Sequence, residues 1–192
     1  VAWTLNLGVG AMMLGVFGGF ALAMVNSFSK TVKPALAIAY AAFQGLALGT
    51  LSQLYNTVYD GIVSQAILVT ISAFAGMLFA YKSGRIRVTP KFTKVLTTAL
   101  IGYLVLALVS FVAFLFTGSS VYNVGGLGLI IATGGMVLAA FFLILDFDSI
   151  QNGIAAGAPE SESWRAAFGL MVTIIWLYME VLRVLSILRG ND

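Results

Sequence analysis

The sequence predicts an all-α protein, a polytopic transmembrane helix bundle that forms a single domain over residues 1–192. Three observations predict this class. Hydrophobic residues make up 60% of the chain and charged residues only 9%. The mean hydropathy is +1.03. The charged residues collect in short segments between apolar runs of about 20 residues, the length that a helix needs to cross the hydrocarbon core. A chain of this composition cannot cover a soluble surface with polar groups, so it is an integral membrane protein.

Six complete spans follow from the apolar runs, and a seventh is expected to be cut. Val1–Leu7 has the character of the end of a helix whose earlier part is missing, which makes the start of the chain look truncated. The complete spans are expected at about residues 9–28, 34–55, 62–81, 92–116, 127–150 and 164–188. Each is close to the length that bilayer thickness requires.

The segments between the spans carry the residues that end and begin helices. Polar residues at 26–29 end the first span, and Pro34 suits the first turn of the second, where its missing N–H would be unpaired in any case. A turn at residues 56–61 precedes the third span. Thr89 and Pro90 are placed to cap and begin the fourth span.

The last two spans are also bounded by residues that begin or end helices. An uncharged Gly/Ser/Asn segment at 117–128 leads into the fifth span, and Gly157 is a plausible stop beyond it. Proline and two acidic residues at 159–162 stand where the start of the last helix favours them. Glycines also recur at small-xxx-small spacing inside the spans, which predicts close helix packing. These glycines are Gly15, Gly18 and Gly19 in the first span and Gly45 and Gly49 in the second.

Basic residues predict the orientation of the chain. Eight of the ten lie in alternate connections that would share one side of the membrane: Lys30, Lys33, Lys82, Arg85, Arg87, Lys91, Lys94 and Arg165. Of the other two, Arg189 lies on the opposite side and Arg183 lies inside the last span. By the positive-inside rule the first group faces the cytoplasm. We therefore expect a multi-pass protein of the inner (plasma) membrane with its carboxyl terminus outside.

Several function classes are excluded by what the sequence lacks. It contains no cysteine and no histidine, which removes disulfides, thiol nucleophiles, imidazole bases and cysteine or histidine metal sites. No glycine pair stands in the spacing of a phosphate-binding loop, and no serine has a base to activate it. We expect no enzyme activity, no cofactor and no nucleic-acid binding. Any proton chemistry must use carboxylates.

Three carboxylates in or beside apolar spans are the candidate functional residues. Asp146 and Asp148 are two residues apart, hence about 200° apart around a helix, so both cannot face the bundle interior. We expect Asp146 to point inward and Asp148 to mark the cytoplasmic edge. Glu180 stands three residues before Arg183. The two can neutralise each other as a structural pair, or Glu180 can take part in an ion pathway or proton relay.

The sequence around these acids resembles a known family. The segment Leu143-Ile144-Leu145-Asp146-Phe147-Asp148-Ser149-Ile150 and the later Leu177-Tyr178-Met179-Glu180-Val181-Leu182 are similar to the closing motifs of the Bax inhibitor-1 (transmembrane Bax inhibitor motif) family, in its bacterial branch. The segment from Lys30 to Gly45 resembles the third helix of that family. The resemblance covers nearly the whole chain.

The resemblance implies a seven-helix bundle with the last helix at its centre, acting as a pH-sensitive calcium leak channel. Asp146 and Glu180 would be the two carboxylates that share a proton and meet the permeant calcium ion, and Lys30 would be the basic latch, with Arg183 as a further counter-charge. Electrostatics is consistent with this mechanism, since ionising both of two adjacent buried carboxylates costs much free energy. Calcium also prefers oxygen ligands, which carboxylates supply. Membrane lipid and calcium are thus the expected partners.

Two other functions stay open. The first is a non-conducting regulator of a membrane-bound ATP-dependent protease, in which the loop from Lys82 to Lys94 would be the contact surface. The second is a proton-coupled transporter.

Overall fold

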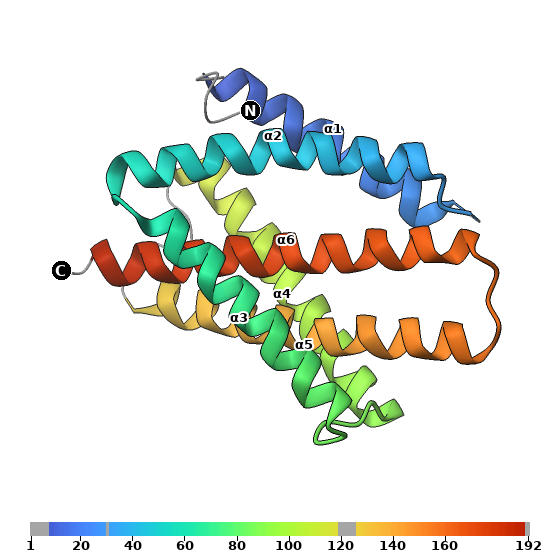
Figure 1. Cartoon of the computed structure of the whole chain (residues 1–192). Coiled ribbons are helices and arrows are strands. Elements are labelled where there is room, and N and C mark those ends of the chain that lie inside the picture. The colour runs from blue at the N-terminus through green and yellow to red at the C-terminus, as the bar shows by residue number, and fades with distance from the viewer. Residues whose placement is uncertain (1–7, 30, 119–125, 191–192) are drawn as a thin grey trace. The chain divides into compact units, whose positions relative to one another are not determined.

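The computed structural model of the chain describes residues 8–29, 31–118 and 126–190 (Figure 1). Within these ranges the regular structure is entirely α-helical. The helices are α1 (Gly8–Phe28), α2 (Pro34–Val58), α3 (Ile62–Lys82), α4 (Pro90–Thr117), α5 (Leu127–Ala155) and α6 (Ser161–Gly190). All six are long and apolar enough to cross a membrane. The prediction of an all-α, multi-pass membrane protein is confirmed. The expected tail of a truncated first helix, Val1–Leu7, lies outside the described residues.

Every helix extends beyond the span expected from the apolar run. The longest extension at one end is that of α5, which continues five residues past the expected span to Ala155; the stop expected at Gly157 follows it, with a φ of +68°. The reason is that polar residues outside the hydrocarbon can still continue a helix. Helix α4 begins at Pro90, with the Thr89 side chain accepting a hydrogen bond from the Phe92 N–H at 3.1 Å. It ends at Thr117 and is capped by Gly118, whose φ of +68° is the left-handed conformation that favours glycine.

The described residues cluster into two compact units. Unit 1 comprises Val1–Val63 and Ser149–Val172, and unit 2 comprises Ser64–Asp148 and Thr173–Asp192. Each unit is described by itself. The single domain expected over the whole chain stays a prediction.

In unit 1, α1 and α2 pack side by side through the glycines of α1 (Figure 1). A Cβ added at Gly15 would lie 2.6 Å from the backbone nitrogen of Ala47, and one at Gly18 would lie 2.5 Å from the Phe43 ring. The small-xxx-small interpretation of α1 is therefore confirmed. At Gly45 an added Cβ would have nothing within 4 Å among the described residues, so close packing at that position stays a prediction.

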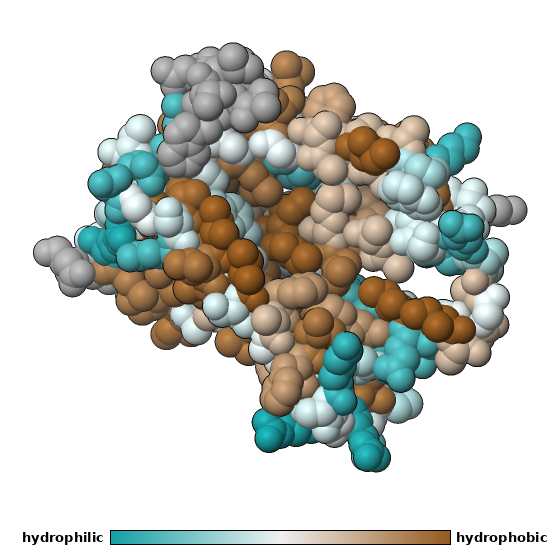
Figure 2. Space-filling model, in the orientation of Figure 1, coloured by the Kyte–Doolittle hydropathy of each residue, from teal (hydrophilic) through white to brown (hydrophobic). Residues whose placement is uncertain are grey.

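In unit 2, small and branched side chains of α5 and α6 form the buried core. Leu143, Ile144 and Leu177 are fully buried. By contrast, α4 presents large apolar side chains outward from Val95 to Phe116. That stretch is about 33 Å long at 1.5 Å per residue, close to the roughly 30 Å of the hydrocarbon core. Exposed apolar side chains are widespread on the molecular surface (Figure 2), as expected for helices that face lipid.

Candidate functional site

A buried carboxylate on α6 is the centre of a polar cluster in unit 2. Glu180 is only 3% exposed. Its Oε1 accepts hydrogen bonds from the hydroxyl of Tyr103 and from Trp176 Nε1, the latter at 3.2 Å. Its Oε2 accepts one from Arg183 Nη1 at 3.1 Å, which makes the pair a salt bridge. Arg183 Nη1 also donates to the Tyr103 hydroxyl oxygen at 3.3 Å. Both oxygens of Glu180 are thus satisfied.

Helix geometry explains how three of these residues meet. Trp176, Glu180 and Arg183 follow one another at spacings of four and three, so they lie on one face of α6. The fourth member comes from α4. The Tyr103 ring also packs against the Trp176 ring, with centroids 5.6 Å apart. The cluster therefore joins α4 to α6 by a charge-assisted hydrogen bond and an aromatic contact.

Gly135 of α5 leaves the space that the cluster occupies. A Cβ added there would lie 2.8 Å from the Tyr103 hydroxyl oxygen and 3.0 Å from Glu180 Cδ. Both distances are shorter than ordinary van der Waals contacts, so an alanine would displace the hydrogen-bonded pair. Gly135 is consequently part of the site, because its lack of a side chain leaves room for the pair, although it has no functional group of its own.

The cluster lies well inside the long apolar stretch of α4, so we expect it deep in the membrane. Tyr103 is eight residues after Val95, the first outward apolar residue of α4, or about 12 Å along the helix axis. The midplane is about 15 Å from the edge of the hydrocarbon. The positive charge of Arg183 compensates Glu180 at this depth, where an unpaired charge is expensive. Of the two interpretations that the sequence left open for Glu180, its pairing with Arg183 is the one that the structure contains.

Asp146 occupies a different environment. Its carboxylate hydrogen-bonds with the Thr173 side chain of α6. Its Oδ2 atom is buried and has no hydrogen-bond partner among the described residues. Thr173 is seven residues before Glu180, or about 10 Å along α6. The structure thus does not bring the Asp146 and Glu180 carboxylates together, and each has its own set of contacts.

Asp148 contacts α3 instead. Its Oδ1 accepts a hydrogen bond from the Tyr81 hydroxyl at 3.2 Å, and Tyr81 is the next-to-last residue of α3. This position, level with the end of a neighbouring helix, fits the expected place of Asp148 near a membrane edge. The helix itself does not end there, since α5 continues to Ala155.

The expected latch residue, Lys30, lies outside the described residues. Beside it in the sequence, the Ser29 carbonyl accepts a hydrogen bond from Arg165 Nη2 at 3.2 Å. Arg165 also pairs with Glu162 at 2.8 Å, so it fixes the start of α6 to the end of α1 within unit 1. As for calcium, no group of three or more acidic side chains able to hold a metal ion occurs in the described parts of the chain. The expected calcium contact of Asp146 and Glu180 stays a prediction.

Sequence reasoning missed Gly135 and the three side chains that contact Glu180 or Asp146, namely Tyr103, Thr173 and Trp176. For Trp176 a signal existed, because an indole N–H four residues before a buried glutamate is within reach on the same helical face. For Tyr103 there was none. It stands 77 residues before Glu180, inside an apolar run in which a tyrosine is unremarkable. Only the packing of α4 reveals it.

Comparison with known proteins gives one result about the whole chain. A family model described as Bax inhibitor 1 like matches residues 1–190. The matched range includes every residue of the cluster and both acidic helices. No curated protein matches the chain, and no solved structure matches it.

Proposed function

Because the chain belongs to the Bax inhibitor 1-like family, we propose that it is a pH-sensitive calcium leak channel in which Asp146 responds to protons and the Glu180 cluster braces the helices. The observation that carries the proposal is the contrast between the two intramembrane acids. Glu180 is neutralised by Arg183 and fully hydrogen-bonded. Asp146 has a buried oxygen without a described partner.

Electrostatics supports the separate roles. A cation that crosses the bilayer needs a compensating negative charge along its way, and calcium prefers carboxylate and carbonyl oxygens. The Glu180–Arg183 pair has no net charge to offer. Asp146 has an unused lone-pair site and makes no described ion pair, so its charge is available to a cation or to a proton. Protonation would remove that charge and thereby change the flux.

Calcium flux in liposomes tests the role of Asp146. The purified protein is reconstituted, and the release of trapped calcium is followed with a dye from acid to mildly basic pH. Asparagine resembles a protonated aspartate in shape and charge. We therefore expect the Asp146→Asn variant to show, at every pH, the flux that the unsubstituted protein shows at acid pH. Asp148→Asn is the matched control and should keep the pH dependence.

Glu180→Gln tests in the same assay whether the Glu180 cluster holds α4 against α6. Loss of the charge-assisted contacts to Tyr103 and Arg183 weakens the link between α4 and α6, and we expect the leak to rise by about tenfold or more, since such a bond contributes about 1.5–3 kcal/mol. A flux that the double variant Asp146→Asn, Glu180→Gln leaves unchanged would refute the proposal. Complete absence of flux, together with co-purification of a membrane protease through residues 82–94, would favour the non-conducting regulator instead.

The proposed setting is the inner (plasma) membrane, with residues 82–94 in the cytoplasm and the carboxyl terminus outside. Five cations in this segment support the orientation. The chain has no cysteine, so a single cysteine at the exposed Ser83 can be labelled selectively. An impermeant maleimide should modify Ser83→Cys only after the cells are permeabilised. Labelling of intact cells at full extent would reverse the orientation.

A further inference from the structure

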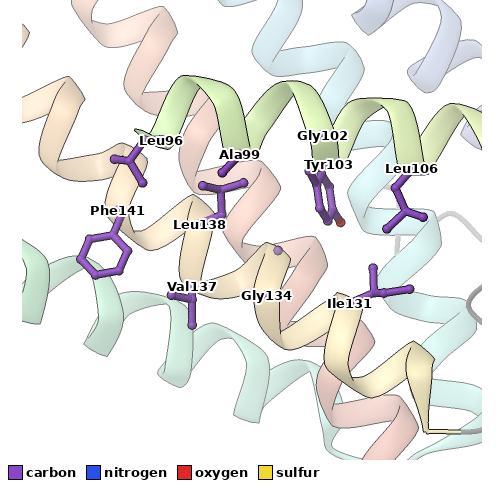
Figure 3. Close-up of a pocket in the computed structure, with 11 residues that line it drawn as sticks. Leu96, Ala99, Gly102, Tyr103, Leu106, Ile131, Gly134, Val137, Leu138 and Phe141 are labelled. Carbon is purple, nitrogen blue, oxygen red and sulfur yellow. The ribbon is translucent and has the colours of Figure 1, made fainter. Parts of the chain in front are cut away.

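An apolar groove lies between α4 and α5 in unit 2 (Figure 3). Its volume is about 420 Å³. Leu96 and Phe141 lie at one end, and Leu106 and Ile131 lie at the other (Figure 3). Gly102 of α4 and Gly134 of α5 line it between these ends. A Cβ added at either glycine would have nothing within 4 Å, so the space beside both is empty of protein.

The groove has the length of one membrane leaflet. From Leu96 to Leu106, and equally from Ile131 to Phe141, there are ten residues, or about 15 Å of helix. Half of the hydrocarbon core is also about 15 Å. The Leu96 end starts beside Val95, where the outward apolar surface of α4 begins. The groove thus runs from the edge of the hydrocarbon toward its middle.

A strongly basic segment lies next to the Leu96 end of the groove. Five exposed cations and no acid occur between residues 82 and 94, namely Lys82, Arg85, Arg87, Lys91 and Lys94. Hydrophilic side chains gather at this α3–α4 connection (Figure 2). Asp148, bonded to Tyr81, is the carboxylate that the described contacts place nearby. None of the five cations forms an ion pair within the described residues, so the positive charge is available to an outside anion.

Lys91 is the cation aligned with the groove. It precedes Gly102 by eleven residues, which is about three turns of helix, so both lie on the same side of α4. Lys94 precedes the same Gly102 by eight residues and therefore lies about 80° away from it around the helix, compared with about 20° for Lys91. The two lysines are otherwise alike, since both are exposed and both stand in the first turns of α4.

We propose that this groove binds one anionic phospholipid, with an acyl chain between α4 and α5 and the phosphate beside Lys91 and the basic connection. Charge complementarity selects the lipid, because basic residues just outside a transmembrane span attract anionic headgroups. A partner helix is too large. A helix about 10 Å across and 15 Å long would occupy roughly 1,200 Å³, well above the volume of the groove. The proposal does not depend on calcium conduction.

The acyl chain would also contact the site described above. Tyr103 lines the groove and donates its hydroxyl to Glu180. A chain in the groove packs against the ring of Tyr103 and limits its movement. Anionic lipid would thus stabilise the hydrogen bond from Tyr103 to Glu180 that links α4 to α6.

Lipid binding to the purified full chain is the test, with phosphatidylglycerol and phosphatidylcholine of identical acyl chains as probes and inorganic phosphate as competitor. Retained lipid is counted by native mass spectrometry, and thermal unfolding in detergent gives a second readout. Gly134→Leu puts a side chain into the groove, and its Cβ would meet no protein atom within 4 Å. Gly76→Leu is its control, because a Cβ at Gly76 of α3 also has open space around it. Lys91→Gln and Lys94→Gln form the matched charge pair.

We expect one retained phosphatidylglycerol per chain in the unsubstituted protein and a higher unfolding temperature with this lipid than with phosphatidylcholine. Gly134→Leu should abolish both effects and Gly76→Leu neither. Lys91→Gln should weaken phosphatidylglycerol binding about fivefold, while Lys94→Gln leaves it nearly unchanged. Equal lipid retention in the two leucine variants would overturn the proposal. So would displacement of the lipid by inorganic phosphate, because that would reveal a headgroup site without the groove, and so would equal effects of the two lysine variants.

Discussion

Replacing Arg183 with methionine should lower the free energy of unfolding by about 3 kcal/mol, because it leaves the charge of Glu180 buried without its counter-charge. Glu180 is 3% exposed, and its remaining partners, Tyr103 and Trp176, are neutral donors. Methionine keeps most of the volume of the arginine stem, so lost packing contributes little. Denaturant titration of the purified protein in detergent micelles measures the change.

Two comparisons separate charge from packing in that experiment. In a Glu180→Met background the same Arg183→Met change should cost far less, since no uncompensated charge remains. Glu162 and Arg165 form an ion pair at the same spacing of three, but their side chains are 35% and 39% exposed. Glu162→Gln should therefore change the stability by less than about 1 kcal/mol. Equal costs of Arg183→Met in both backgrounds would contradict the charge explanation.

Gly15→Ala should destabilise the packing of α1 on α2 in unit 1 by up to about 3 kcal/mol. The added Cβ would lie 2.6 Å from the backbone nitrogen of Ala47 and 2.7 Å from the carbonyl oxygen of Phe43. Backbone atoms cannot turn aside as a flexible side chain can, so the two helices would have to separate. The free energy of unfolding in micelles reports the cost.

Gly10→Ala is the control in the same helix. A Cβ at Gly10 would have nothing within 4 Å, and alanine favours a helix by up to about 1 kcal/mol over glycine. The two identical substitutions should therefore change the stability in opposite directions. Loss of stability at both positions would show that the close contact at Gly15 is not the cause.

Much of the fold followed from the sequence because the bilayer imposes its dimensions on the chain. A span must be about 20 apolar residues long and must satisfy its own backbone hydrogen bonds, so each apolar run becomes a helix. Local chemistry then fixed some ends, as at Pro34, Thr89 and Pro90. The apolar run ended five residues before α5 does, because polar residues outside the hydrocarbon can continue a helix, whereas Gly157 marked the stop correctly.

The candidate site was only partly predictable. Asp146, Asp148 and Glu180 could be selected because an acid within an apolar span is costly and needs a reason. The partners of these acids on other helices could not be selected. Asp146 has Thr173, Asp148 has Tyr81, and Glu180 has Tyr103, each from another helix. The expected shared proton between Asp146 and Glu180 assumed that α5 and α6 meet in a register that the structure does not have.

The two acids in apolar helices, and the class of membrane protein around them, were determined by the sequence itself, since hydropathy and charge cost act on each residue where it stands. The pairing of Glu180 with Arg183 follows from their spacing of three residues, but the contact of Glu180 with another helix was decided by the tertiary structure alone. Gly135 lets Tyr103 of α4 reach Glu180 beside Arg183, while Asp146 keeps a buried oxygen without a described partner. The physical reason is that hydrogen bonds and ion pairs act over a few ångströms, and residues 77 positions apart come within that range only through helix packing.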